Sequence, residues 1–85
     1  MNKPITLNDG TVLIGHVLET ENRLFLYIYG GLTLAEVFQA ANDPDKTKKI
    51  TVGEGDTVTI YKNYKHLCAI SEESMGMISA VLKKG

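Results

Sequence analysis

One segment of this chain has a helical repeat, and it restricts the fold more than any other feature. In the stretch GLTLAEVFQAANDPDKTKKI (residues 31–50), Thr33 and Glu36 have the spacing of a capping box. Pro44 ends the helix, because the residue before a proline disfavours helical dihedral angles. We therefore predict one helix at about residues 33–42, which at this length is too short to be stable alone in water. Its predicted core-facing stripe is Leu34, Val37, Phe38 and Ala41.

The segments on either side of the helix have the pattern of short β-strands. Near the N-terminus, Asp9-Gly10 is typical of a two-residue type I′ hairpin turn. That turn would put on one face of the hairpin Ile5, Leu7, Val12 and Ile14, followed by His16 and Leu18. Gly15 lies inside the second strand, which indicates a bulge or a close approach by another backbone.

Further strands are predicted at residues 24–29, 50–52, 57–62, 64–71 and 77–84. The strand at 64–71 has apolar residues on both faces, so we expect it to be central in the sheet. Asn63 interrupts the run before it. The prediction is a single α+β domain covering residues 1–85, built as a mostly antiparallel sheet or partly open barrel of six to seven short strands with one packed helix.

Composition narrows the classes of function. The chain has 85 residues, 44% of them hydrophobic, and a formal net charge of −1. A dedicated nucleic-acid-binding domain is usually strongly basic, so nucleic acid is an unexpected partner. The single cysteine excludes an internal disulfide and favours a reducing compartment. The N-terminal residues lack the apolar core of a signal peptide, and no apolar run is long enough for a membrane span.

The strand at residues 24–29 has two chemically different faces. Leu24, Leu26 and Ile28 form one, and the other is Phe25, Tyr27 and Tyr29. Such an aromatic face is used by single-strand binders to stack bases. It equally serves in packing against a neighbouring element, or at a subunit contact, where tyrosine is enriched. We favour the contact surface and predict self-association or a protein partner through Phe25, Tyr27 and Tyr29.

A second candidate site is a run of lysines. Five of the nine basic residues fall between positions 46 and 65. If they converge, they would form a local anion-binding patch, although a solvated face or a guard against edge-to-edge strand pairing explains them as well. The residues of this alternative are Lys46, Lys48, Lys49, Lys62, Tyr64 and Lys65.

The sequence contains no pattern that indicates catalysis or a cofactor. Structural zinc needs four ligands at recognisable spacings, and His16, His66 and Cys68 are too few. We expect Cys68 to be a small core residue rather than a nucleophile. The chain has neither a glycine-rich phosphate loop nor a serine elbow. We therefore predict no catalytic residues, no metal and no cofactor.

Several stretches together carry a resemblance to a protein group. ITLNDGT, LTLAEVFQAANDPDKTKKIT, YKNYKHLCAI and the final ISAVLKK resemble, in this order, small prophage-encoded proteins of Gram-positive gut bacteria. The genes of those proteins tend to lie among tail and baseplate genes. The resemblance implies a virion-associated or tail-assembly role, and no residue in it carries known chemistry.

The sequence thus predicts a non-enzymatic structural or protein-interaction module, associated with a phage virion or tail. It would be found in the cytoplasm of the bacterial host or in the virion. The alternative is a small binding module for an anionic ligand or single-stranded nucleic acid. Neither alternative involves a membrane.

Overall fold

The computed structural model describes residues 2–85, which form seven strands, one α-helix and one short 3-10 turn. The strands are β1 (Lys3–Thr6), β2 (Val12–Glu19), β3 (Arg23–Tyr29), β4 (Lys49–Val52), β5 (Thr59–Lys62), β6 (Tyr64–Glu72) and β7 (Ile78–Lys84). The helix α1 spans Leu34–Ala41, and the 3-10 turn η1 spans Ser74–Gly76. The predicted α+β class, with one helix on a mostly antiparallel sheet, is confirmed.

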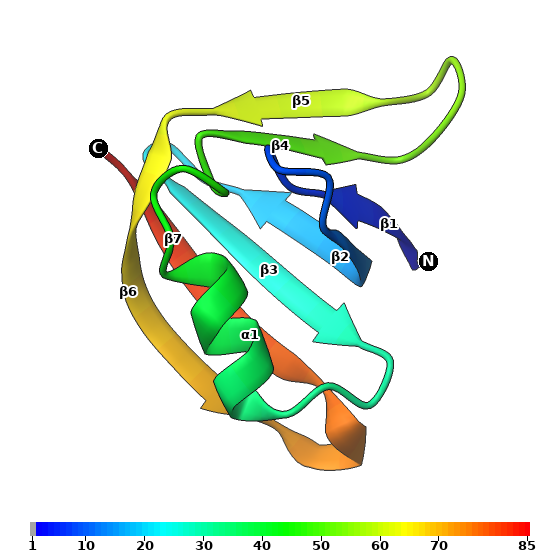
Figure 1. The fold of residues 1–85 in the computed structure, drawn as a ribbon, viewed down its shortest axis with the longest axis vertical. Helices are drawn as coiled ribbons and strands as arrows, with labels where there is room; N and C mark the ends of the chain where they lie inside the picture. The colour runs from blue at the N-terminus through cyan, green and yellow to red at the C-terminus, as the bar shows by residue number, and fades with distance from the viewer. Residues whose placement is uncertain (1) are drawn as a thin grey trace.

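All seven strands belong to one antiparallel sheet in the order β5-β4-β1-β2-β3-β7-β6. The sheet curls without closing into a barrel, and α1 lies over one face, in contact with β7 and β6 (Figure 1). The two edge strands, β5 and β6, are consecutive in sequence and are separated by Asn63 alone. The chain therefore passes from one edge of the sheet to the other within a single residue.

Asn63 makes this passage because its backbone is left-handed, with φ of 68°. Its N–H donates to the Lys48 carbonyl at 3.0 Å, beside β4, and its carbonyl accepts from the Gly85 N–H at 2.9 Å, after β7. Asparagine tolerates this conformation better than most residues. The predicted break at Asn63 is confirmed, and it draws the two edges of the sheet together at one end.

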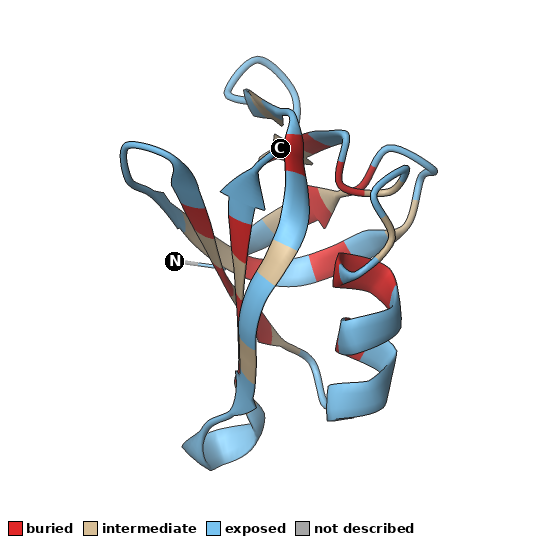
Figure 2. Cartoon of the chain, turned by 90° about the vertical axis from the view of Figure 1, so that its left-hand side faces the viewer, coloured by how far each residue is buried: buried red, intermediate tan, exposed pale blue. Residues whose placement is uncertain are grey.

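The core lies between α1 and the concave face of the sheet. Its largest fully buried side chains are Tyr64, Ile5, Leu24, Leu26, Ile28, Ile50, Ile78, Leu82 and Val37. Buried positions alternate with more exposed ones along β3, β4 and β7, as a half-covered sheet requires (Figure 2). This burial holds α1 in place, as expected for a helix of eight residues.

The helix begins as predicted but presents a different face to the core. The Thr33 side chain accepts from the Glu36 N–H and the Glu36 carboxylate accepts from the Thr33 N–H, which completes the capping box. Val37 and Ala41 are buried, together with Ala40. Leu34 and Phe38, predicted to face the core, are 38% and 44% exposed. The small residues Ala40 and Ala41 let the helix pack closely against the sheet on their side. The helix is therefore turned about its own axis, and the predicted stripe no longer faces the core as a whole.

The first hairpin is also in a different register from the predicted one. Thr6 pairs with Val12 and Ile5 pairs with Leu13. The Leu7 N–H donates to the Thr11 carbonyl, so the loop has three residues and ends at Gly10, whose φ is +93°. Three-residue loops with a left-handed glycine are a common alternative to the two-residue turn. The extra residue turns β2 over, because a shift by one residue moves every side chain to the other face.

The strand β6 lies at an edge, so the prediction that it is central was wrong. Two irregularities in its pairing with β7, at Tyr64/His66 and at Leu67/Ala69, interrupt the simple alternation of sides. Leu67 and Ile70 pack against the core. The apolar residues that suggested two buried faces therefore come from a bulged strand with one buried face.

Candidate functional site

The sheet face that α1 leaves uncovered has the character of a contact surface. We define the helix-free face as Val12, Ile14, His16 and Leu18 of β2 with Phe25, Tyr27 and Tyr29 of β3. The pairings Ile14–Tyr29, His16–Tyr27 and Leu18–Phe25 set these side chains opposite one another on adjacent strands. All three predicted interaction residues lie here together.

Three aliphatic residues of the helix-free face are largely open to solvent. Val12 is 55% exposed, Ile14 45% and Leu18 53%. The sequence predicted that they share a face with Ile5 and Leu7, which are buried, and the three-residue loop places them on the opposite side. A strand segment with alternating faces indicates which residues travel together, but not which of the two sets is buried.

Aromatic rings stack at the centre of the helix-free face. The His16 and Tyr27 ring centroids lie 4.8 Å apart with an interplanar angle of 22°, and His16 and Tyr29 lie 5.8 Å apart at 32°. Phe25, Tyr27 and Tyr29 are half-buried against their neighbours. The rings are thus fixed against one another while part of each remains exposed, which suits a preformed contact surface.

The two ends of this side of the sheet carry opposite charges. At one end, Lys83 of β7 is paired with Arg23 of β3 and with His66 of β6. At the other end the Ser71 hydroxyl donates to the Glu73 carboxylate at 2.9 Å and lies 3.1 Å from the Ser79 hydroxyl. The aromatic centre therefore lies between an end with Arg23 and Lys83 and an end with Glu73.

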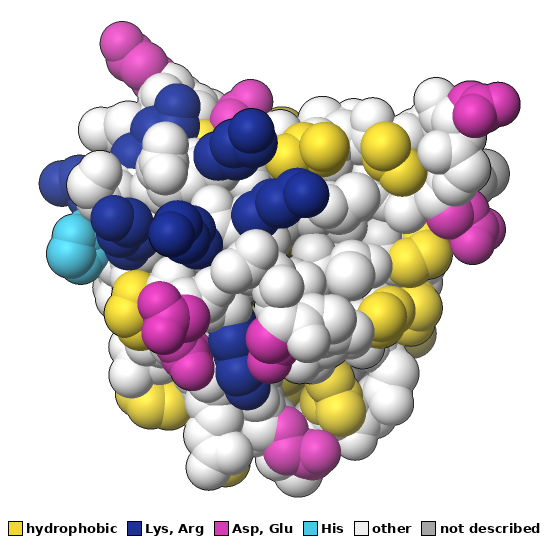
Figure 3. Space-filling model, turned by 45° about the horizontal axis from the view of Figure 1, so that its top comes forward, with side chains coloured by type: hydrophobic (Ala, Val, Ile, Leu, Met, Phe, Trp, Pro, Cys, Tyr) yellow, Lys and Arg dark blue, Asp and Glu magenta, His cyan; other side chains and the backbone are white. Residues whose placement is uncertain are grey.

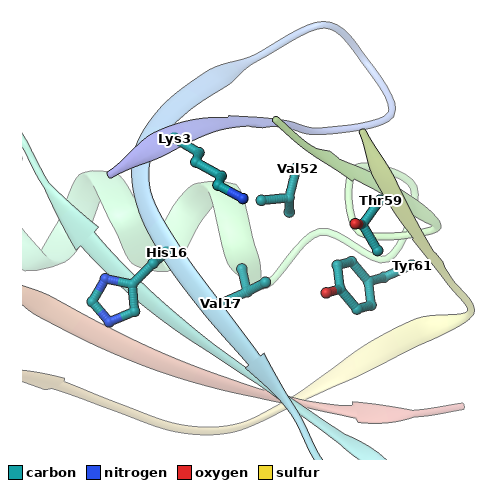
Figure 4. Close-up of a pocket in the computed structure, with 6 residues that line it drawn as sticks. All are labelled: Lys3, His16, Val17, Val52, Thr59 and Tyr61. Carbon is teal, nitrogen blue, oxygen red and sulfur yellow. The ribbon is translucent and has the colours of Figure 1, made fainter. Parts of the chain in front are cut away.

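A cavity of about 310 Å³ opens on the concave side between β2 and the β4–β5 wing. The Lys3 ammonium, the Tyr61 hydroxyl and the side chain of Thr59 surround it, and Val17 and Val52 supply its apolar walls (Figure 4). The ring of His16 points away from this space (Figure 4). We name it the mouth pocket; none of its lining residues was predicted as a site.

Next to the mouth pocket, two tyrosines lie near one carboxylate. The Tyr64 hydroxyl donates to Glu19 Oε2 at 2.7 Å, although the Tyr64 side chain is fully buried. Burial and this contact raise the pKa of Tyr64 to about 12. Burial, with a smaller effect of the Glu19 charge, also raises the pKa of Tyr61. Both phenols stay protonated at neutral pH, so they act there as hydrogen-bond donors.

The predicted lysine patch is brought together only in part. Lys48, Lys49 and Lys62 line one hollow of about 310 Å³ with Asn8 and Asn63, which we name the lysine pocket. Figure 3 shows basic side chains gathered over this end of the molecule. The sequence missed Asn8, because only the β1–β4 pairing brings the first hairpin to this place.

The other three predicted anion-site residues lie elsewhere. The Lys46 ammonium is 3.7 Å from the Asp9 carboxylate and lines a different hollow. Tyr64 is buried, with the Lys84 ammonium 5.5 Å from its ring centroid. Lys65 is exposed beside Gly85 and does not line the lysine pocket. Tyr64 was misassigned because its strand bends at Asn63, which directs its side chain into the core.

An apolar groove runs between the outer side of α1 and β6. Leu34, Ala35, Phe38 and Gln39 line it with Ile70. It results from the rotation of the helix that leaves Leu34 and Phe38 exposed.

The remaining polar candidates do not form a site. Cys68 is exposed, against the prediction of a core position, because the bulge in β6 turns it outward. Within residues 2–85, no cluster of three or more His, Cys, Asp or Glu side chains has the arrangement of a metal site. In the same part of the chain, no helix is both long enough and apolar enough to cross a membrane.

Comparisons with known proteins returned no matching family model, no matching curated protein and no matching solved structure.

Proposed function

We propose that this protein is a non-enzymatic interaction module that self-associates through the helix-free face. The observation that carries the proposal is that Val12, Ile14 and Leu18 are about half exposed beside the stacked rings of His16 and Tyr27. Contiguous apolar surface on a soluble protein commonly marks an interaction site. Aromatic residues are enriched in the centres of protein contacts, and charged residues are depleted there.

Pairing of edge strands is a less favourable route to self-association. The long edge strand β6 has two irregularities and an exposed lysine, Lys65. Bulges and edge lysines are the devices that prevent two sheets from joining edge to edge. The other edge, β5, has four residues and carries Lys62. Association through a face of the sheet is therefore favoured over association through its edges.

A second copy of the chain fits the charges around the helix-free face. In a two-fold dimer whose axis lies in the interface plane and runs across the strands, each copy's strands run opposite to the other's. The Arg23 and Lys83 end of one copy then lies over the Glu73 end of its partner. A two-fold contact must be self-complementary, and opposite charges at its two ends satisfy that condition.

We also propose, from the sequence resemblance alone, that the assembled module belongs to a phage tail or virion. The protein would then be present in the host cytoplasm during assembly and in the finished particle.

The experiment is the solution mass, measured by light scattering across a range of concentrations for three proteins. We expect the wild type to form dimers or a larger closed assembly. Leu18→Lys should be monomeric, because it places a charge in the apolar part of the contact, opposite Phe25. Phe38→Lys is the matched control, since Phe38 is comparably exposed but lies on α1, and it should associate like the wild type.

The salt dependence tests the orientation of the two copies. Glu73→Lys should weaken association at low salt, because both ends of the face then carry positive charge, and added salt should reduce this defect. A wild type that is monomeric at every concentration would refute self-association. A Phe38→Lys variant that dissociates while Leu18→Lys does not would move the contact to the groove beside α1.

A further inference from the structure

We infer that the lysine pocket binds a multiply charged phosphate group, such as a phosphomonoester or a short polyphosphate. None of the five residues that line it belongs to the helix-free face, so this inference does not depend on self-association. It rests on the geometry, the uncompensated charge and the hydrogen-bond donors of the pocket.

The backbone brings the three lysines to one place on the surface. Lys49 and Lys62 are directly opposite in the β4–β5 pairing, so their side chains leave the sheet on the same side. Lys48 is held beside them because its carbonyl accepts from the Asn63 N–H at 3.0 Å. The hollow that they surround has a volume of about 310 Å³.

Within residues 2–85, no carboxylate lies within 4.0 Å of these three ammonium groups, and the one ion pair joins Lys46 to Asp9. Like charges directly opposite on neighbouring strands destabilise a sheet. The chain nevertheless places three positive charges around one hollow without an acidic partner. A bound anion would supply the missing compensation.

The donors around the hollow suit phosphate oxygens. Each ammonium group has three N–H donors and no acceptor. The Asn8 amide is held in position by donating to the Asp45 carbonyl at 3.0 Å. Hydrogen bonds from an ammonium group to a phosphate oxygen are charge-assisted, and such bonds are about twice as strong as neutral ones. Two further lysines, Lys83 and Lys84, lie at the same end of the sheet, where the Gly85 N–H donates to the Asn63 carbonyl.

The pocket lacks what a single-stranded nucleic acid would need in addition. Binding of single strands combines a basic groove with aromatic rings on which bases stack. Tyr64, the ring expected among these lysines, is fully buried in the core. The lysine pocket therefore has phosphate donors without a stacking platform, which favours a compact phosphate ligand over a strand of nucleotides.

The test is calorimetric titration of the full chain with sodium tripolyphosphate at low salt. We expect the wild type to bind, and Lys49→Gln and Lys62→Gln each to weaken binding about tenfold or more, as loss of a charge-assisted hydrogen bond implies. Lys62→Arg should keep most of the affinity. Lys3→Gln is the control, because it removes the same charge from the mouth pocket and should bind like the wild type.

Three results would overturn the inference. One is a wild type that does not bind tripolyphosphate at low salt, and another is a Lys3→Gln variant that loses as much affinity as Lys62→Gln. The third is an oligothymidylate of equal charge that binds more tightly than tripolyphosphate, which would make the ligand a nucleic acid. The Leu18→Lys variant should still bind tripolyphosphate, so failure of self-association and failure of this site are distinguishable.

Discussion

The Tyr64 hydroxyl donates a 2.7 Å hydrogen bond to the Glu19 carboxylate, which joins the first residue of β6 to the last residue of β2. These residues are 45 positions apart in sequence. The contact lies where the chain bends between the two edge strands, so it helps to fix that bend. Hydrogen bonds to a charged acceptor contribute more than neutral ones, although the exposure of Glu19 reduces the gain.

The first prediction follows from the pKa of Tyr64, which the structure raises from 10.0 to about 12. A raised pKa means that the folded protein keeps the phenol proton where the unfolded chain has lost it. The stabilising contribution is therefore complete below pH 10 and is lost as the pH rises towards 12. We expect urea unfolding from pH 7 to 12 to show two differences from the wild type. Tyr64→Phe should have a lower free energy of unfolding at pH 7, and that free energy should fall less steeply with pH above pH 10. Tyr29→Phe controls for removal of a hydroxyl, and equal slopes above pH 10 would contradict the assignment.

The second prediction concerns Gly15, where β2 and β3 approach closely. A Cβ atom at this position would lie 1.8 Å from the Tyr27 carbonyl oxygen, closer than any real contact. Gly15→Ala should therefore lower the free energy of unfolding by about 3 kcal/mol, through forced backbone shifts.

The comparison for Gly15 is Gly55→Ala. Gly55 has a φ of +66° and open space around it, so alanine there costs about 1 kcal/mol of backbone strain alone. Chemical denaturation of both variants measures the difference. A Gly15→Ala protein as stable as Gly55→Ala would show that the two strands do not approach as described.

The third prediction tests the rotation of α1. Val37 is fully buried and Phe38 is 44% exposed. Val37→Ala should cost about 2 kcal/mol, from the lost methyl groups and the cavity that remains. Phe38→Ala removes a larger side chain but should cost less than about 1 kcal/mol, because most surface substitutions have small effects. Thermal unfolding of the two variants under identical conditions compares them. A Phe38→Ala protein that loses as much stability as Val37→Ala would place Phe38 in the core, as the sequence predicted.

The fourth prediction follows from the like-charge pair Lys49 and Lys62. Lys62→Gln should stabilise the protein by roughly 0.2–1 kcal/mol at low salt, because it removes a repulsion between directly opposite side chains. The gain should shrink in high salt, where the repulsion is screened. Lys3→Gln is matched in charge but faces Gly15 across β1–β2, so it should not stabilise. A Lys62→Gln protein that is less stable at low salt would mean that the two lysines do not repel each other.

Local signals in the sequence predicted the structural features that are set by residues close together in the chain. The Thr33–Glu36 capping box began the helix at the expected place. The close approach at Gly15 and the break at Asn63 were also confirmed, since glycine and asparagine allow backbones that other residues resist. For the candidate site, the period of two in β3 correctly placed Phe25, Tyr27 and Tyr29 on one face.

The tertiary structure decided the features that depend on residues distant in sequence, namely which strand faces are buried and which side chains meet. The hairpin loop has three residues where two were predicted. This difference of one position determined whether Val12, Ile14 and Leu18 are buried. The order of the strands placed Asn8 beside Lys62. Periodicity states which side chains share a face, because it is a property of the backbone alone. Which face is buried, and which charges meet, depends on the pairing of strands across the whole sheet.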